Sequence, residues 1–413
     1  MIPLALLTRT TPKGHIRQFS ALRRKIPRAL LDGNFTTSDS GDMGFNSTVS
    51  LSTFRYLLHN VLGKSMKDAA MALPRPIRSA LAALALLGAA HGANALDLQP
   101  LVDEVPAGTV LRISDPATQR AFELTELGDD LGFDIEWANI SGGPPSLEAF
   151  RAGALDGSVI ADIPAIHATW TNLPVGVVDV RVKTDPIANP FTTFGIAPGV
   201  EFNSLADLKG KRIAYSPSQI HGVVVLRALA AAGLTRDDVT LIELPSKGDD
   251  YVVSLANNQV DIAPLHGILT ARYMKLYERD GAKLFSHGQR DDISYFYSPQ
   301  KTLEDPAKAA ALAKYLAARA KATIWIQSNP ETWIKEYLVA KEGLDAESGA
   351  YLVKANGFYA YPENWDEVIS LHQKTIELLA ETTGNKVYDA AVNFDRRFEH
   401  IASDALQAGA AGQ

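Results

Sequence analysis

Strands and helices alternate along the chain from Thr109 onward, and this alternation constrains the fold more than any other feature of the sequence. Thr109–Ser114 is β-branched and alternating, as in a strand, and Asp115–Leu131 begins with Asp-Pro and continues as a helical run. The same order repeats with short loops as far as Arg279, and beyond Asp305 the pattern becomes almost entirely helical. Strands and helices joined by short loops predict parallel sheets with helices on both faces.

A secretory signal peptide is predicted at residues 66–95, ahead of the first strand. Arg75 and Arg78 form a positively charged region, and Ser79–Ala90 is an apolar stretch that is too short to span a membrane as a helix. Ala93–Ala95, with the sequence Ala-Asn-Ala, has the small residues of a cleavage site. The three parts of an export signal therefore occur in their usual order, and we expect the mature chain to begin after Ala95.

Residues 1–65 show no clear periodicity and mix basic with Ser/Thr-rich stretches. Because a signal peptide normally begins a chain, we interpret 1–65 as an extension from an over-extended translation start, and we expect it to be disordered. Residues 407–413 are rich in Ala and Gly, and we expect a frayed tail there.

Charge and composition exclude several functions. The 413 residues carry a net charge of −7, which divides into +8 over residues 1–95 and −15 over the rest. An acidic body argues against a nucleic-acid partner, which needs a basic surface. The chain has no cysteine, so it can form no disulfide, thiolate zinc site or cysteine nucleophile. No two mature-chain histidines stand four residues apart, and we predict no metal site, no cofactor and no catalytic residue.

Three loops follow a predicted strand and open a helix, namely Ser141–Ser146, Ala161–Ala165 and Ser216–His221. In an open α/β sheet, ligands bind at the carboxyl ends of the strands. The first turn of a helix offers unpaired N–H groups and the positive end of a dipole, so it suits an anion. The alternative is that these serines only cap helices, as Ser204 is expected to do. Three such loops in one chain favour a ligand site.

Three longer segments carry a family resemblance. They read EWANISGGPPSLEAFRAGALDGSVIADIPAIHA, SLADLKGKRIAYSPSQIHGVVVLRALAAAGL and LANNQVDIAPLHGI. The matching motifs are the helix that contains Leu147–Ala149, the Asp162–Pro164 loop and the strand entry at Leu208–Lys211. Over Thr109–Leu379 the chain resembles the periplasmic substrate-binding proteins of ABC importers for sulfonates, taurine, nitrate and related compounds.

The resemblance implies an α/β, two-lobed fold of the type II periplasmic-binding-protein kind. Each lobe would be a mostly parallel sheet with helices on both faces. Lobe one would comprise residues 96–189 and 292–413, and lobe two residues 190–291. Two crossing segments, Pro190–Phe194 and Asp291–Tyr297, would join the lobes around a ligand cleft.

The resemblance also implies that loops at helix starts hold the ligand. Carried over by position, the predicted ligand-binding residues are Asp115, Thr118, Gln119, Gly142, Gly143, Asp162, Ile163, Ser216, Ser218, Gln219, His221, Pro264 and His266.

We expect neutral donors to hold an anion in this site, chiefly the N–H groups near Gly143 and Ser218, rather than Arg272 or Lys247. Two departures from the family leave the identity of the solute open. Sulfonate binders commonly carry tryptophans in the segment corresponding to 260–266, which has none here, and Ser-Pro-Ser replaces a Gly-Ser opening at 216–218.

The function implied is that of a periplasmic solute receptor. It would bind a small anionic or zwitterionic organic solute between its lobes, close by a hinge movement and deliver the solute to an ABC permease in the inner membrane. It would act as a monomer and not as an enzyme. Two alternatives stay open, a periplasmic enzyme on the same fold and a sensory binding module.

Overall fold

The computed structural model describes residues 99–411, with the exception of Ser141, Ser218 and Lys247. The signal peptide predicted at 66–95 and the extension predicted at 1–65 lie outside the described residues. Within the described part, no helix is both long enough and apolar enough to cross a membrane.

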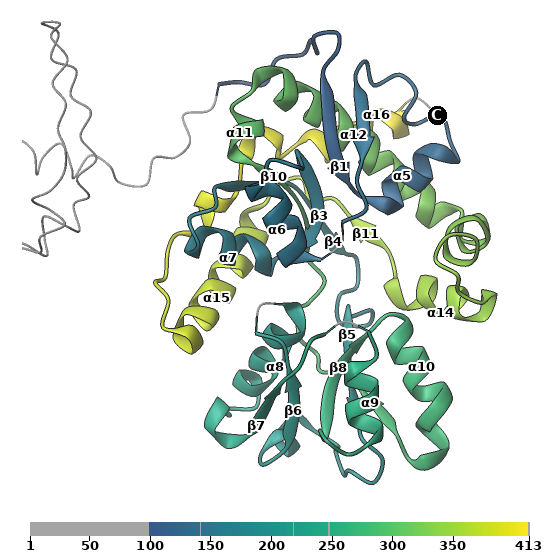
Figure 1. Ribbon diagram of the computed structural model, residues 1–413, viewed down its shortest axis with the longest axis vertical. Coiled ribbons are helices and arrows are strands. Elements are labelled where there is room, and N and C mark those ends of the chain that lie inside the picture. Colours follow the sequence, from purple (N-terminus) through teal and green to yellow (C-terminus); the bar gives the residue numbers. More distant parts are fainter. Residues whose placement is uncertain (1–98, 141, 218, 247, 412–413) are drawn as a thin grey trace, which may run out of the picture. The chain divides into compact units, whose positions relative to one another are not determined.

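Two β-sheets organise the chain from residue 110 onward (Figure 1). We call the six-stranded sheet and its helices lobe one, and the five-stranded sheet and its helices lobe two. The sheet of lobe one has the order β11-β4-β10-β3-β1-β2. Its strands are β1 (Val110–Ser114), β2 (Asp134–Trp137), β3 (Gly157–Ala161), β4 (Val175–Lys183), β10 (Ser294–Pro299) and β11 (Tyr359–Ala360).

The sheet of lobe two has the order β7-β6-β8-β5-β9. Its strands are β5 (Thr192–Ile196), β6 (Arg212–Tyr215), β7 (Thr240–Glu243), β8 (Ile262–His266) and β9 (Lys283–Phe285). All of these strands lie between the end of β4 and the start of β10 in the sequence. The predicted residue boundaries of the lobes stay a prediction.

The two-lobed α/β architecture is confirmed, but both sheets are more mixed than predicted. β1 pairs in parallel with β2 and β3, and β6 pairs in parallel with β7 and β8. β10 runs antiparallel to β3 and β4, and β5 runs antiparallel to β8 and β9. The reason is that β5 and β10 are the strands that enter a sheet directly from a crossing segment, without a helix that would reverse the chain first.

Helices cover the two sheets. The helices that lie before β5 or after β9 in the sequence are α5 (Pro116–Glu123), α6 (Gly143–Arg151), α7 (Ile163–Trp170), α11 (Gln300–Leu303), α12 (Pro306–Ser328), α13 (Pro330–Trp333), a π-helical stretch (Ile334–Val339), α14 (Ala346–Asn356), α15 (Asp366–Thr383) and α16 (Ile401–Ala411). The helices that lie between β5 and β9 are α8 (Ile220–Ala231), α9 (Asp250–Ala256) and α10 (Ile268–Tyr277). α16 continues to Ala411, so the tail predicted to fray from residue 407 is helical up to that point.

Several helix starts follow directly from the sequence. Asp115 caps α5 by accepting a hydrogen bond from the N–H of Thr118, and Asp305 caps α12 in the same way. Pro116 and Pro306 occupy the first helical positions, where a missing N–H costs nothing. The expected capping at Ser204 is also present, as a capping box with Asp207.

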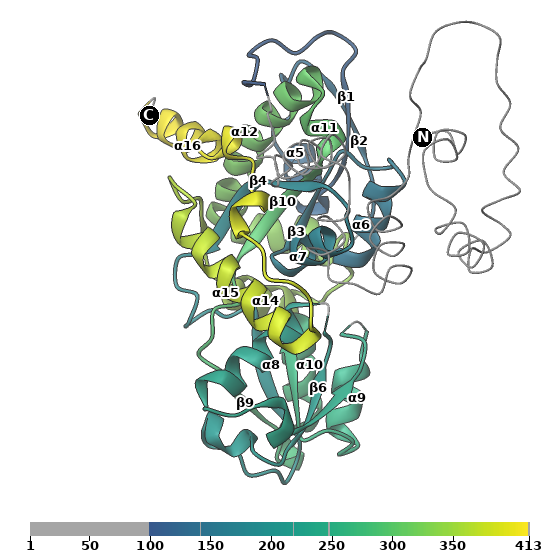
Figure 2. The same ribbon diagram turned by 90° about the vertical axis from the view of Figure 1, so that its left-hand side faces the viewer.

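Apolar packing joins the two lobes on the side of α8. Ile163 on α7 and Ile376 on α15 lie in the same buried cluster as Val223 and Val224 of α8. Figure 2 shows α15 extending toward α8, next to lobe two. The crossing segments are therefore not the only connection between the lobes.

Candidate functional site

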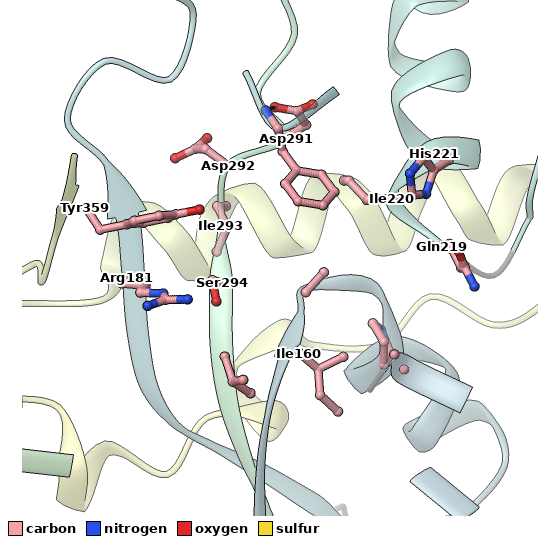
Figure 3. A pocket seen from close by; sticks show the side chains of 16 residues that line it. Ile160, Arg181, Gln219, Ile220, His221, Asp291, Asp292, Ile293, Ser294 and Tyr359 are labelled. Atoms are coloured by element: carbon pink, nitrogen blue, oxygen red, sulfur yellow. Dashed lines mark hydrogen bonds between the residues drawn. The ribbon is translucent and has the colours of Figure 1, made fainter. Parts of the chain in front are cut away.

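A cavity of about 330 Å³ lies where the two lobes and the crossing segments meet. This volume falls in the range of roughly 300–1,000 Å³ that is typical of small-molecule sites. Its lining comes from β3, the starts of α6 and α8, the crossing segments and the end of β4 (Figure 3). The lining residues are Gly142, Gly143, Val159, Ile160, Ala161, Pro164, Arg181, Phe191, Gln219, Ile220, His221, Asp291, Asp292, Ile293, Ser294 and Tyr359.

Four of the predicted site residues meet in this cavity, namely Gly142, Gly143, Gln219 and His221. A second cavity of about 910 Å³ shares Gly142, Gln219 and His221 with the first and is also lined by His266. The second predicted loop contributes Ala161 and Pro164 to the first cavity, so all three predicted loops reach one hollow although they are far apart in the sequence. Ser218 lies outside the described residues.

The loop before α6 differs from the prediction in where its helix starts. α6 begins at Gly143, inside the segment predicted to be a loop, and Gly142 has a positive φ of 88°. A Cβ atom on Gly143 would lie 2.4 Å from Cγ of Pro164, so only glycine permits this approach to α7. Pro144 and Pro145 follow and have no N–H group. The start of α6 therefore presents fewer anion-binding donors than an ordinary helix.

The start of α8 fits the prediction more closely. Gln219 precedes the helix without capping it through its side chain, so the first amides of α8 have no side-chain acceptor at that position. Gly222 lies against the preceding turn, where an added Cβ would be 2.1 Å from the carbonyl oxygen of Ser216. This glycine allows the turn and the helix to pack tightly next to the cavity.

Asp115 and Thr118 are buried in the interior of lobe one and do not line either cavity. The Asp115 carboxylate accepts a 2.7 Å hydrogen bond from Nε of Arg319 and a 2.8 Å bond from the Thr118 hydroxyl. Arg319 also pairs with Asp179. Gln119 hydrogen-bonds Glu123 one helical turn away. These residues cap and anchor α5, a role that a helix-start motif cannot distinguish from ligand binding.

The second predicted loop also turns inward. The Asp162 carboxylate lies 3.5 Å from the guanidinium of Arg227 on α8, and the Ile163 side chain is fully buried beside that helix. Burial raises the pKa of Asp162 despite the neighbouring Arg227 charge. Only Ala161 and Pro164 of this loop line the cavity. The loop thus connects the lobes in this structure.

Ser216 and Pro264 are buried within lobe two. Pro264 stands on β8 opposite Phe194 of β5, in the middle of the sheet. Neither residue lines the two cavities.

Arg181 and Tyr359 line the cavity but were not predicted from the sequence. Arg181 is near the end of β4, and Tyr359 is on β11, which pairs with β4. The Arg181 guanidinium lies over the Tyr359 ring, 4.6 Å from its centroid, as in a cation–π contact. The only signal in the sequence was a lone arginine near the end of the long apolar strand 175–183. Nothing in the sequence around 359 marked a two-residue strand.

The carboxylates of Asp291 and Asp292 are turned away from the hollow into the crossing segments. Asp291 accepts hydrogen bonds from the N–H groups of Phe191 and Thr192, at 2.8 and 2.7 Å, and from the Thr192 hydroxyl at 2.7 Å. Asp292 accepts from the Lys183 N–H at 3.0 Å and pairs with Arg290 at 2.6 Å. Both carboxylate side chains have 0% exposure, so these two residues line the cavity without offering it a free carboxylate.

His221 and His266 form a pair at the boundary of the two cavities. Nε2 of His221 lies 2.9 Å from Nδ1 of His266, and the Phe191 ring stacks on His266 with centroids 5.4 Å apart. Burial and, to a smaller extent, the nearby His266 lower the pKa of His221 to about 3. Burial also lowers the pKa of His266. At neutral pH this pair is therefore uncharged and offers imidazole donors and acceptors rather than a positive charge.

The cavity has a polar group at each end and an apolar middle. Figure 3 shows Arg181 and Tyr359 on one side, His221 and Gln219 on the other, and Ile160 and Ile293 between them. Among the described residues, no group of three or more metal-ligating side chains is present. The arrangement suits non-covalent binding of a small organic molecule, and no nucleophile is hydrogen-bonded to a base among the lining residues that the structure describes.

The chain has the two-lobed fold of periplasmic binding proteins, with a cavity between its lobes. Residues 173–332 match the family described as NMT1/THI5 like. A curated protein of Escherichia coli (strain K12), named as an aliphatic sulfonates-binding protein, is 31% identical over 105 residues. That match covers 25% of this chain and 32% of the relative's length.

Solved structures of sulfonate-binding proteins share the whole fold. The periplasmic aliphatic sulphonate binding protein SsuA from Escherichia coli is similar with a TM-score of 0.59 at 22% identity, covering 69% of this chain and 92% of that one. The alkanesulfonate-binding protein SsuA from Xanthomonas axonopodis pv. citri, bound to MOPS, is similar with a TM-score of 0.56 at 20% identity, covering 73% and 98%. These comparisons confirm the fold and the resemblance from which it was expected.

Proposed function

We propose that this protein is a periplasmic solute receptor that binds a small anionic or zwitterionic organic solute between its two lobes and delivers it to an ABC permease. The observation that carries the proposal is the cavity between the lobes, which is lined by helix starts from both lobes and by both crossing segments. A site built from both lobes binds its ligand most tightly when they are closed on it. Ligand binding therefore favours the closed arrangement of the lobes, and a permease can recognise that arrangement.

Export to the periplasm is part of this proposal. It is supported by the predicted signal peptide at 66–95 and by the names of the similar proteins. We expect periplasmic protein to begin at Leu96, which N-terminal sequencing of a periplasmic extract would show. A chain that stays in the cytoplasm and keeps residues 66–95 would contradict this part of the proposal.

An enzyme on the same fold is the alternative that has to be tested. The described lining offers one arginine, one neutral histidine and two carboxylates that are fully engaged in the crossing segments. None of these groups is arranged as a nucleophile with its base. A binding role needs only donors, acceptors and an apolar surface, all of which the cavity has. The proposal therefore treats the protein as a receptor without turnover.

Native mass spectrometry of protein purified from the periplasm tests the proposal. We expect one co-purified solute per chain, released unchanged on unfolding. Rebinding in calorimetry is expected to saturate at a ratio of one, and small-angle scattering is expected to show a smaller radius of gyration with the solute bound. Conversion of the solute during incubation would favour the enzyme. A sensory module would bind in the same way but would be captured by a signalling protein instead of a permease.

A further inference from the structure

The charge that the cavity presents to a ligand comes from Arg181. Its Nε is buried, and none of the described residues accepts a hydrogen bond from it. Within the described part of the chain, no carboxylate lies within 4.0 Å of its guanidinium. A buried N–H without an acceptor costs free energy, and arginine binds an oxyanion through two parallel hydrogen bonds. This end of the cavity is thus incomplete until a ligand oxyanion occupies it.

The charge of Arg181 is tolerated because an acidic network lies behind it. Asp115 and Asp179 share the one buried guanidinium of Arg319. Burial acts to raise the pKa of both carboxylates, and the charges of Arg319 and, more weakly, Arg181 oppose it, so that the pKa of Asp115 is lowered and that of Asp179 is raised. The Tyr359 ring covers the guanidinium on one face. Arg181 is therefore held in place without a direct ion pair that a ligand would have to displace.

Among the described lining residues, no carboxylate is available to pair with an ammonium group. The carboxylates of Asp291 and Asp292 are the acidic groups of the lining, and their side chains have 0% exposure. Each of their four oxygens already accepts at least one hydrogen bond from Phe191, Thr192, Lys183 or Arg290. Removing an ammonium group from water without a counter-charge is costly. The site therefore disfavours zwitterions.

The rest of the lining accommodates an apolar body with an uncharged polar end. Val159, Ile160, Ile220 and Ile293 line the space between Arg181 and the histidine pair. At the far end, Nδ1 of His221 is buried and has no partner among the described residues, although the side chain is 5% exposed. A neutral imidazole nitrogen can hydrogen-bond a hydroxyl group without any change of charge.

From these observations we propose that the ligand is an organic monoanion with an apolar body and no ammonium group, and that Arg181 binds its acid group beside Tyr359. The inference rests on the proposed receptor function and narrows the solute class from anions and zwitterions to monoanions. It also moves the anion from the helix starts, where the sequence placed it, to the end of β4. The acid group itself is a carboxylate or a sulfonate, which share the required oxyanion.

A matched set of probes tests the proposal by calorimetry on the ligand-free protein. The set is 1-propanesulfonate, 3-hydroxy-1-propanesulfonate, 3-amino-1-propanesulfonate and butanoate. We expect the hydroxy compound to bind at least as tightly as 1-propanesulfonate. The amino compound is expected to bind weaker by about tenfold or more, which corresponds to about 1.4 kcal/mol. Comparison of 1-propanesulfonate with butanoate identifies which acid the site prefers.

Variants at Arg181 test the residue assignment. Arg181→Gln is expected to weaken binding of 1-propanesulfonate by about 10- to 100-fold, the range for a hydrogen bond to a charged group. Arg181→Lys keeps the charge but loses the paired N–H groups, and we expect an intermediate affinity. Arg151→Gln removes an exposed arginine of α6 that lines neither cavity, and it is expected to bind like the wild type. Circular dichroism and the unfolding midpoint of each variant establish that it is folded.

The outcomes separate the two proposals. Tight binding of the amino compound, or unchanged binding by folded Arg181→Gln, overturns the monoanion inference but leaves the receptor function intact. If no member of the set binds and no solute co-purifies, the receptor function fails, and the inference fails with it. A loss of affinity in Arg181→Gln for each monoanion, with Arg151→Gln unaffected, supports both.

Discussion

The carboxylate of Asp291 accepts hydrogen bonds from both the main-chain N–H and the side-chain hydroxyl of Thr192, each at 2.7 Å. These residues belong to different crossing segments, 99 positions apart in the sequence. His287 lies 3.5 Å from the same carboxylate and also contacts the Thr192 carbonyl oxygen at 2.8 Å. One buried side chain thus fastens the two segments that join the lobes.

Asp291→Asn is expected to destabilise the protein. The Phe191 N–H donates to one oxygen of Asp291 and the Thr192 N–H to the other, so an amide places its NH₂ group against one of these N–H donors and at least one charge-assisted hydrogen bond is lost. We expect the free energy of unfolding at pH 7 to fall by about 2–3 kcal/mol, measured by urea denaturation. Asp280→Asn, at an exposed position, is the matched control and is expected to leave stability unchanged.

The pH dependence of this difference provides a second check. Burial by itself would raise the pKa of Asp291, but the hydrogen bonds from His287, Thr192 and Phe191 outweigh it, and the pKa is lowered. A carboxyl group whose folded pKa is depressed stabilises the fold above its unfolded pKa of about 3.9, and this contribution is lost as the pH falls through the folded value. The difference in the free energy of unfolding between wild type and Asp291→Asn is therefore expected to be constant from pH 8 to pH 5 and to shrink below about pH 4.

Acid is expected to destabilise the fold through two buried histidines. Burial lowers the pKa of His221 to about 3 and that of His372 to about 4. The unfolded chain binds a proton on each near pH 6.5 and the folded chain does not, so stability rises with pH across this range. As the pH falls from 7 to 5, each histidine is expected to lower the free energy of unfolding by about 2 kcal/mol, measured by urea denaturation at the two pH values.

The histidine variants identify the source of this effect. His372→Gln is expected to reduce the difference in stability between pH 7 and pH 5, whereas His400→Gln, at an exposed position, is expected to leave it unchanged. Equal slopes for wild type and His372→Gln would contradict the assignment.

Ligand affinity is expected to be constant from pH 5.5 to pH 8. The groups that face His221 are His266, Tyr251 and, at longer range, the Asp291 carboxylate. Burial is the main cause that lowers the pKa of His221 to about 3, and it raises that of Tyr251, so neither group changes charge in this interval. Burial also lowers the pKa of His266 and thereby reduces its protonation there. Calorimetric titration of 1-propanesulfonate at several pH values measures this directly. A steep loss of affinity with rising pH that disappears in His221→Gln would show instead that a protonated histidine binds the anion.

Asp115→Asn separates a structural role from a ligand-binding role. The Asp115 carboxylate is buried against Arg319, and removing one partner of a buried ion pair typically costs roughly 3–5 kcal/mol. We expect that loss in the free energy of unfolding and no change in the dissociation constant of the folded variant for 1-propanesulfonate. An unchanged stability together with weaker binding would restore Asp115 to the site. Asp129→Asn, on the exposed side of the loop after α5, serves as the control.

The sequence predicted the order of strands and helices well because hydrophobic alternation and helix-start residues are local signals. A long, mostly apolar run of the sequence forms β4, and the loops at Gly142–Gly143 and Gln219–His221 line the cavity. The antiparallel pairs of β5 and β10 depend on which lobe a strand enters, and local periodicity does not encode this. For the same reason the two-residue strand β11 was missed.

The site was only partly predictable because one local pattern serves two purposes. An aspartate just before a helix that starts with proline gives the same sequence pattern whether it faces a cleft or an arginine in the interior. The prediction placed Asp115 and Asp162 in a cleft, but each faces an arginine in the interior. Arg181 illustrates the opposite case. Its importance comes from Tyr359, 178 positions away, and from carboxylates that face elsewhere. Such relationships exist only in three dimensions.

The hydrogen bonds of Asp291 also limit the kinds of lobe movement that require little free energy. Its carboxylate holds two consecutive amides of the other crossing segment, so sliding one segment along the other would break both hydrogen bonds at once. Bending of the pair as a unit preserves them. The lobes are therefore expected to rotate about a hinge axis close to Asp291 and not to shear past each other.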